Sequence, residues 1–335
     1  MTTPRMKRYS SLMFTLAGLA AVCLATADGR AQLREAAPQG VGMLHVQGRV
    51  HMLVVGGVNI AVQVGDDGVL LVDAGTEATA PQVIAAIRTL STKPIHTIIN
   101  THVHPDSTGG NEALVKLRGT GAPQPVRVMA HAAVLNRLLA ASTASSTPVT
   151  GFRLNAAITL PINNTYDTAT KDFYLNGESI IVHHEPAAHT DGDSLVHFRS
   201  SDVLAVGDLF NADRYPVIDL AAGGSVRGLI AALNHILELT VPARFQEGGT
   251  YVIPGHGRLC DEADVVEYRD MVTIVSERVQ DLIAKGLTWD QVKAARPSRD
   301  YDPEYGTEEG PSTPDRFVEA IYRSLTNKSE VRSVK

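Results

Sequence analysis

The sequence predicts an α/β protein in which β-sheets are covered by helices. Short β-type runs alternate with segments whose apolar residues recur at helical spacing, and this alternation occurs in both halves of the chain. The chain has 335 residues, of which 44% are hydrophobic, so it is long enough for a large core in one large domain or two small ones.

The N-terminus predicts an export signal. Three basic residues among the first ten precede the apolar run Leu12 to Ala27, which ends in Ala-Thr-Ala. The run is shorter than the about 20 residues that a membrane span needs. We therefore expect residues 1–27 to be a cleaved signal peptide, with cleavage after Ala27 or Ala31, no stable membrane insertion afterwards, and a periplasmic or secreted location.

The composition narrows the class of partner. The net charge is −6 with a pI near 6.0, and no cluster of basic residues follows the first ten, which argues against nucleic acid as a partner. Cys23 would leave with the signal, so Cys260 would remain alone and no internal disulfide is expected.

The first half begins with a flexible lead over residues 28–42 and continues with strands and helices. The expected strands are Val50 to Val55, Asn59 to Val64, Val69 to Asp73, Ile95 to Asn100 and Val126 to Ala130. Thr76 is placed to cap a helix that ends before Pro94, and further helices are expected from Asn111 to Arg118 and from Ala132 to Ala140. The segment Ser142 to Thr150 has the composition of a loop or flap.

The second half repeats this order and ends in helices. The expected strands are Asp172 to Leu175, Ser179 to His184, Leu195 to Phe198, Val203 to Val206 and Tyr251 to Ile253. The expected helices are Ser225 to Leu239, Glu262 to Lys285, a short one opened by the capping box Thr288 to Gln291, and Asp315 to Leu325. We expect the main domain to span residues 43–300, followed by an irregular segment, a helix and a disordered tail over residues 301–335.

Polar residues follow the strand that ends at Asn100. His102, His104 and Asp106 stand at alternate positions, and two imidazoles with a carboxylate are ligands that zinc takes in proteins. The alternative is a solvated, histidine-rich loop.

Three other expected strands are also followed by metal-type side chains, namely His189, Asp208 and His256. Glycines flank Asp208 and His256 and allow the backbone to approach closely. One such residue alone would more often cap a helix or lie on the surface. Their combination favours a metal site formed where strand-end loops converge.

These segments resemble, in their order along the chain, the motifs of the metallo-β-lactamase superfamily. The resemblance covers roughly residues 42–276 and rests on Leu71-Val-Asp-Ala-Gly75, Thr101-His-Val-His-Pro-Asp-Ser107, Ala188-His-Thr190, Gly207-Asp-Leu-Phe210 and Pro254-Gly-His-Gly257. It implies an αββα four-layer sandwich with an active site at one edge that holds one or two zinc ions.

The resemblance also implies roles for individual residues. His102, His104 and His189 would hold the first zinc, and Asp106, Asp208 and His256 the second. Zinc with an open position supplies hydroxide near neutral pH, and Asp106 would be catalytic by orienting that nucleophile and moving its proton. Asp73 would support a ligand loop.

The chain departs from the family pattern next to the second metal. Ser107 stands where many members have a further histidine, and Asp208 stands where some β-lactamases have cysteine. Asn211 replaces the lysine that grips the β-lactam carboxylate, a role that Arg214 could take over. We therefore expect weaker zinc binding at the second position, and we leave the β-lactam substrate open.

The function expected from these observations is an exported zinc-dependent hydrolase whose metal-bound hydroxide attacks the carbonyl of a lactam, lactone, ester or thioester. One alternative is iron-dependent oxidation of a persulfide, against which the export signal argues. The other is a non-catalytic metal-binding or scaffold protein, against which the complete set of six candidate ligands argues.

Overall fold

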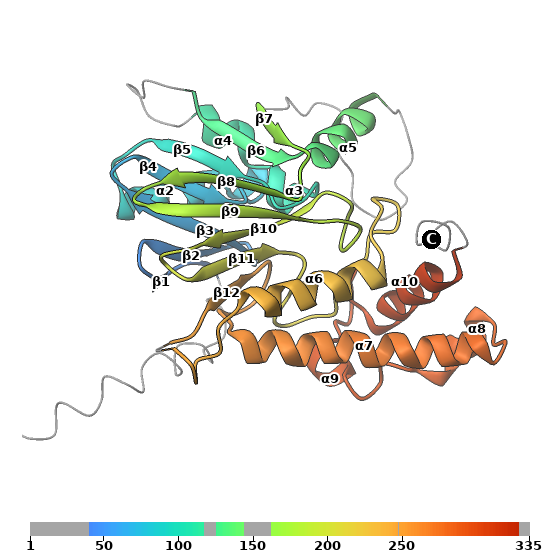
Figure 1. Ribbon diagram of the computed structural model, residues 1–335. Helices are drawn as coiled ribbons and strands as arrows, with labels where there is room; N and C mark the ends of the chain where they lie inside the picture. Colours follow the sequence, from blue (N-terminus) through green and yellow to red (C-terminus); the bar gives the residue numbers. More distant parts are fainter. Residues whose placement is uncertain (1–39, 117–124, 144–161, 247, 328–335) are drawn as a thin grey trace, which may run out of the picture.

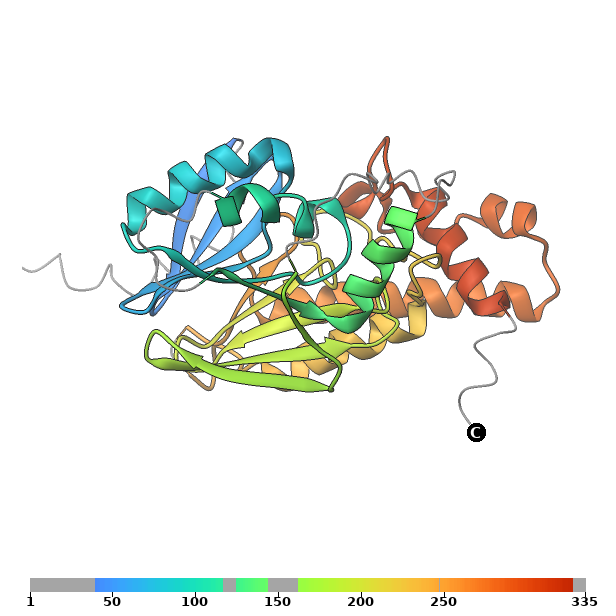
Figure 2. The same ribbon diagram turned by 90° about the horizontal axis from the view of Figure 1, so that it is seen from above.

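The computed structural model describes residues 40–116, 125–143, 162–246 and 248–327, and its two β-sheets lie between two groups of helices (Figures 1 and 2). This arrangement confirms the expected αββα sandwich. Three separate groups of buried residues fill the sandwich. One lies between the two sheets, and each of the other two lies between one sheet and its helices.

The larger sheet has seven strands in chain order, antiparallel from β1 to β4 and parallel from β4 to β7. Its strands are β1 (Val41–Gln47), β2 (Val50–Val55), β3 (Val58–Gly65), β4 (Gly68–Val72), β5 (Ile95–Ile99), β6 (Arg127–His131) and β7 (Asn164–Tyr166). The helical elements of this half are η1 (Glu77–Thr79), α2 (Ala80–Leu90), α3 (Pro105–Thr108), α4 (Asn111–Lys116) and α5 (Ala132–Thr143). Val83 and Ile87 of α2 pack on the outer face of this sheet.

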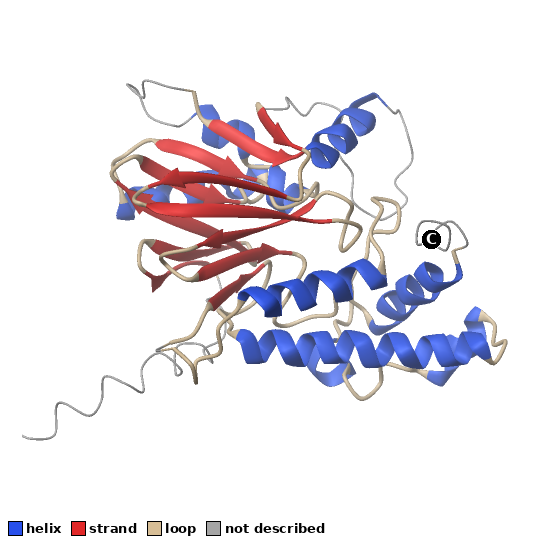
Figure 3. Cartoon of the chain, viewed as in Figure 1, coloured by secondary structure: helices blue, strands red, loops and turns tan. Residues whose placement is uncertain are grey.

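The smaller sheet has five strands in the order β12-β11-β10-β9-β8, with only the β11–β12 pair parallel. The strands are β8 (Thr170–Leu175), β9 (Glu178–Glu185), β10 (Asp193–Phe198), β11 (Val203–Gly207) and β12 (Tyr251–Pro254). Its helices, which Figure 3 shows gathered on one side, are α6 (Val226–Leu239), α7 (Glu262–Ala284), α8 (Trp289–Ala295), α9 (Asp302–Tyr305) and α10 (Pro314–Thr326).

The last helix belongs to the core of this half. Phe317, Val318 and Ile321 of α10 are buried in the same cluster as Leu229 of α6 and Val272 of α7. The packed fold therefore continues past residue 300, where the sequence placed the end of the main domain.

The expected strands and longer helices are present with small shifts at their ends, but four elements were not expected. Strand β1 begins at Val41, within the lead expected over residues 28–42, and β7, α3 and α9 are each only three or four residues long. Three expected segments lie outside the described residues: the proposed signal peptide, the tail after residue 327, and the part of the expected flap from residue 144 onward. In the described part of the chain no helix is both long enough and apolar enough to cross a membrane.

The two sheets are joined at the edge where several strands end. The Ser194 N–H at the start of β10 donates to the Thr101 carbonyl just after β5, at 2.8 Å. The Asn59 N–H on β3 donates to the Gly255 carbonyl after β12, at 2.9 Å. Loops that follow β5, β9, β11 and β12 are thereby held at one rim of the sandwich.

Candidate metal centre

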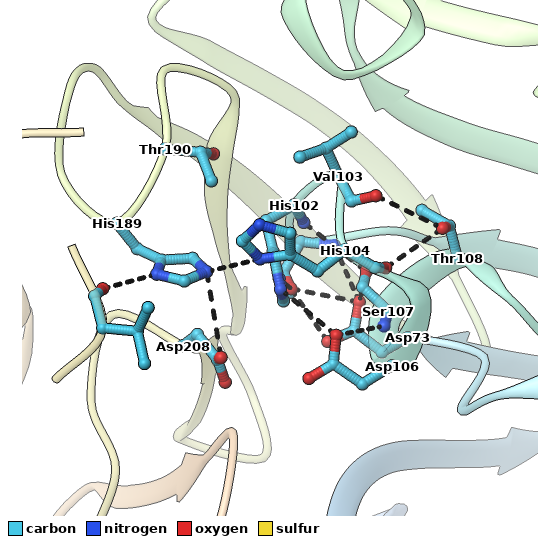
Figure 4. A network of polar contacts seen from close by, with 12 residues as sticks. Asp73, His102, Val103, His104, Asp106, Ser107, Thr108, His189, Thr190 and Asp208 are labelled. Carbon is cyan, nitrogen blue, oxygen red and sulfur yellow. Dashed lines mark hydrogen bonds and ion pairs between the residues drawn. The ribbon is translucent and has the colours of Figure 1, made fainter. Parts of the chain in front are cut away.

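All six candidate ligands meet at this rim, five of them labelled in Figure 4. They come from the ends of four strands: His102, His104 and Asp106 after β5, His189 after β9, Asp208 after β11 and His256 after β12.

His102, His104 and His189 form a buried trio of imidazoles. Their ring centroids lie 4.7 to 5.1 Å apart, and each side chain is at most 6% exposed. The His104 Nδ1 and the His189 Nε2 are only 2.8 Å from each other. The three rings therefore face one small space.

The outer nitrogen of each ring has a partner that fixes the tautomer. His104 Nε2 donates to Asp219 Oδ2 at 3.0 Å, and His189 Nδ1 donates to the Val217 carbonyl at 2.6 Å. Because a carboxylate and a carbonyl only accept, these nitrogens carry the protons and the inner nitrogens present lone pairs.

His102 follows the same rule through a hydroxyl. Thr101 Oγ1 donates to Asp73 Oδ2 at 2.8 Å and so accepts from His102 Nδ1, which lies 2.9 Å away. The inner nitrogen, His102 Nε2, is buried and lies 3.5 Å from Asp106 Oδ1. When the three rings are neutral, their inner nitrogens point lone pairs into one space, and this arrangement fits a metal ion with nitrogen ligands, such as zinc.

Asp106, Asp208 and His256 form a second, more open half of the centre. His256 Nε2 lies 3.6 Å from Asp106 Oδ2 and 3.5 Å from Asp208 Oδ1, and its Nδ1 donates to the Gly57 carbonyl at 2.6 Å. One oxygen of each aspartate also lies within 4.8 Å of a His102 ring nitrogen. The two halves therefore adjoin.

The charges around the centre favour a cation. Burial lowers the pKa of His102, but hydrogen bonding and charge from Asp106, with Asp208 and Asp73, outweigh it and raise that pKa to about 10. Burial likewise lowers the pKa of His256, yet Asp208 and Asp106 raise it to about 9. The negative potential that produces these shifts would stabilise a bound metal ion in the same way.

Asp73 anchors the ligand loop from behind. Its φ of 71° lies in the left-handed region, which an aspartate adopts at some cost. It accepts hydrogen bonds from the Thr101 N–H at 2.8 Å, from the Thr101 hydroxyl and from the Ser107 hydroxyl. Burial raises the pKa of Asp73 to about 6, against the lowering effect of His102 and these donors.

Three further residues lie next to the candidate ligands, and the sequence indicated only the first of them, Asn211. Asn211 is buried, and its side-chain oxygen has no hydrogen-bond partner in the part of the chain that the structure describes. Asp219 and Val217, which orient two of the three imidazoles, were not singled out because they stand in an irregular segment without a recognisable motif.

The fold and the site together define an αββα protein with a group of histidines and aspartates that could hold metal at the rim of the two sheets. The family model of the metallo-beta-lactamase superfamily matches residues 53–256. The chain belongs to the metallo-beta-lactamase superfamily. A search of curated proteins gave no match.

Solved structures share the fold. The inverting sec-alkylsulfatase Pisa1 from Pseudomonas sp. is 16% identical, with a TM-score of 0.60 over 87% of this chain and 52% of its own, so the chain spans about half of that enzyme. A metallo-beta-lactamase from Pontibacter korlensis is 20% identical, with a TM-score of 0.50 over 70% of this chain and 99% of its own. The DIM-1 metallo-beta-lactamase is 16% identical, with a TM-score of 0.52 over 71% and 99%.

Proposed function

We propose that the protein is an exported, zinc-dependent hydrolase that attacks the carbonyl group of a small-molecule lactam, lactone, ester or thioester. The observation that supports it best is the trio of buried imidazoles whose inner nitrogens face one point beside two aspartates. Zinc bound there would act as a Lewis acid and make hydroxide available near neutral pH.

Asp106 is the residue that we assign to proton movement. Its carboxylate lies between the two halves, with Oδ1 3.5 Å from His102 Nε2 and Oδ2 3.6 Å from His256 Nε2. The Ser107 N–H donates to Oδ1 at 3.1 Å, and the side chain is 21% exposed. Asp106 is thus held in place yet open to solvent. It would orient the attacking water, take its proton and deliver that proton to the leaving group.

Arg214 is the group that we assign to substrate recognition. It follows Asp208 by six positions in the loop after β11, and its charge opposes, after burial, the raised pKa of His256. The side chain is 33% exposed and is paired with Asp213 by a contact of 2.8 Å. A partly exposed guanidinium in this loop favours a substrate with an anionic group that displaces Asp213.

A substrate panel on zinc-loaded protein tests the reaction class. The panel contains β-lactams, lactones, esters and thioesters, and also sulfate esters because the alkylsulfatase shares the fold. We expect activity on at least one class and its loss by about a thousand-fold or more in His104→Ala, which removes one inner nitrogen. The matched control is His45→Ala, since His45 is an exposed histidine on β1.

The outcomes separate the alternatives. A zinc-loaded wild type that is inactive on the whole panel would contradict the hydrolase. Iron in the protein as purified, with consumption of glutathione persulfide, would favour the oxidation reaction. Absence of bound metal and of both activities would favour a scaffold.

The proposal of export rests on the basic and apolar segment at the N-terminus. Fractionation of the producing cells should place the protein outside the cytoplasm, and its N-terminal sequence should begin at Asp28 or Gln32. A chain that retains Met1 in the cytoplasmic fraction would contradict export.

A further inference from the structure

The two halves of the centre offer different donor atoms. The imidazole half presents three ring nitrogens, whereas the carboxylate half presents two aspartates and one ring nitrogen. Imidazole suits zinc and its neighbours in the transition series, and carboxylate suits harder ions such as Mn²⁺ and Mg²⁺. We propose that the centre holds two different kinds of ion: zinc retained in the imidazole half and an exchangeable hard divalent cation, of which Mn²⁺ is the probe, in the carboxylate half.

This inference rests on the proposed function only for the identity of the first ion. Zinc exceeds manganese in intrinsic affinity at most nitrogen and oxygen sites. The difference in affinity between zinc and manganese is large at a site of three nitrogens and small at a site of two carboxylates and one nitrogen. The occupant of the carboxylate half would then follow the supply of ions.

Exposure distinguishes the halves in the same direction. The side chains of His102, His104 and His189 are 3%, 6% and 2% exposed. Asp106 and Asp208, by contrast, are 21% and 11% exposed. Water therefore reaches the carboxylate half more easily, and a hard cation keeps part of its hydration shell when it binds.

Ser107 removes one further donor from the carboxylate half. Its side chain is buried, and its hydroxyl donates to Asp73, the residue that anchors the ligand loop. The hydroxyl is thereby engaged by Asp73. Position 107 thus contributes structural support in place of a metal ligand.

The support of His256 also differs from that of the buried trio. Its ring is held by the carbonyl of Gly57, at the tip of the β2–β3 hairpin, where Gly56 and Gly57 both have positive φ. Asn59 then ties this hairpin to the loop after β12 by donating to the carbonyls of Pro254 and Gly257 at 2.9 and 3.0 Å. The single imidazole of the carboxylate half is therefore held in place. The preference of this half for one metal ion over another then depends on its donor atoms.

Loss of one supporting contact of a ligand commonly costs about 10- to 100-fold in metal affinity. Replacing an imidazole donor by none should cost at least as much. We therefore expect the second zinc to bind at least about tenfold more weakly than the first.

Metal exchange measured without substrate tests the proposal. Zinc-saturated protein is dialysed against a chelator of intermediate affinity, its metal content is determined, and Mn²⁺ is then titrated while its electron paramagnetic resonance signal is followed. We expect one zinc per chain to remain and one Mn²⁺ per chain to bind beside it. Simultaneous loss of both zinc ions, or no Mn²⁺ binding to the one-zinc protein, would overturn the proposal.

Two variants at one position provide the matched comparison. Ser107→His adds an imidazole beside the second half, whereas Ser107→Ala removes the hydroxyl without adding a donor. We expect Ser107→His to raise the affinity for the second zinc at least about tenfold over Ser107→Ala. Equal affinities in two variants that both retain the first zinc would refute the role assigned to position 107.

Asp208→Cys approaches the same question from the other side. A thiolate is a soft ligand, so this variant should hold the second zinc more tightly and lose binding of Mn²⁺. Unchanged Mn²⁺ binding would contradict the proposal. All of these readouts are metal contents and spectra, so an inactive protein that shows them would refute the hydrolase and leave the mixed-metal centre standing.

Discussion

Asp219→Asn removes one charge from the carboxylate that fixes His104 and keeps the shape of the side chain. In the wild type, one oxygen of Asp219 accepts from His104 Nε2 at 3.0 Å and the other accepts from the Ala222 N–H at 2.9 Å. Asparagine has a single acceptor oxygen, so its amide group must face one of these two donors.

The expected change in metal affinity follows from the two possible orientations of the asparagine amide. If its oxygen stays on the Ala222 N–H, its NH₂ group faces His104 Nε2, and the ring moves its proton to Nδ1, the atom that faces the metal. If its oxygen turns to His104, the Ala222 N–H is left unsatisfied in a buried place at a cost of about 1–3 kcal/mol. Metal binding requires the second arrangement and must offset its cost, so we expect metal affinity at the imidazole half to fall about 10- to 100-fold.

Competition of the apoprotein with a chromophoric zinc chelator measures this change. Asp172→Asn is the matched control, because it removes one negative charge from an exposed position on β8. The control should bind zinc as the wild type does. Affinity of Asp219→Asn within twofold of the wild type would refute the idea that Asp219 sets the tautomer of His104.

Three further predictions concern the fold. Gly228→Ala should destabilise the protein by about 2–4 kcal/mol in chemical unfolding, because its Cβ would clash with the backbone carbonyl of Ala187; an unchanged midpoint would contradict that packing. Ile321→Ala should lower the free energy of unfolding by about 2–5 kcal/mol, because Ile321 of α10 is buried in the core. A change near zero would contradict that placement of α10. Burial and nearby positive groups lower the pKa of His183 and of His197 to about 4, below the about 6.5 of an unfolded chain, so stability is full above pH 6.5 and falls toward pH 4. Urea unfolding of metal-free protein should lose about 2 kcal/mol per histidine between pH 7 and 5, and His197→Gln should remove its share; an equal pH dependence in the variant would contradict this.

Much of the fold was predictable because its strands and helices have strong patterns of their own. The strand from Val50 to Val55 and the helix that begins after Ser225 have the bounds expected from alternation and capping, within a residue or two. Strand β1 was missed because it is a partly exposed edge strand that needs β2 as a partner to be defined. Strand β7 has three residues, too few for any periodicity.

The candidate ligands could be found because each follows a strand, but the residues that orient them could not. Asp219 meets His104 across 115 positions of sequence, and no local pattern announces that contact. The contact made by Ser107 could not be predicted from the sequence either. The sequence indicates that its hydroxyl is a poor zinc ligand, and only the fold shows that this hydroxyl is held by Asp73.

X-ray absorption at the zinc edge, on protein purified without added metal, tests the centre most directly. Three converging imidazole nitrogens predict one firmly retained zinc per chain with nitrogen neighbours at about 2.0–2.1 Å and the multiple-scattering pattern of imidazole. His104→Ala should lose that pattern. Folded wild-type protein without zinc, or zinc surrounded only by oxygen, would contradict the metal centre assigned to His102, His104 and His189.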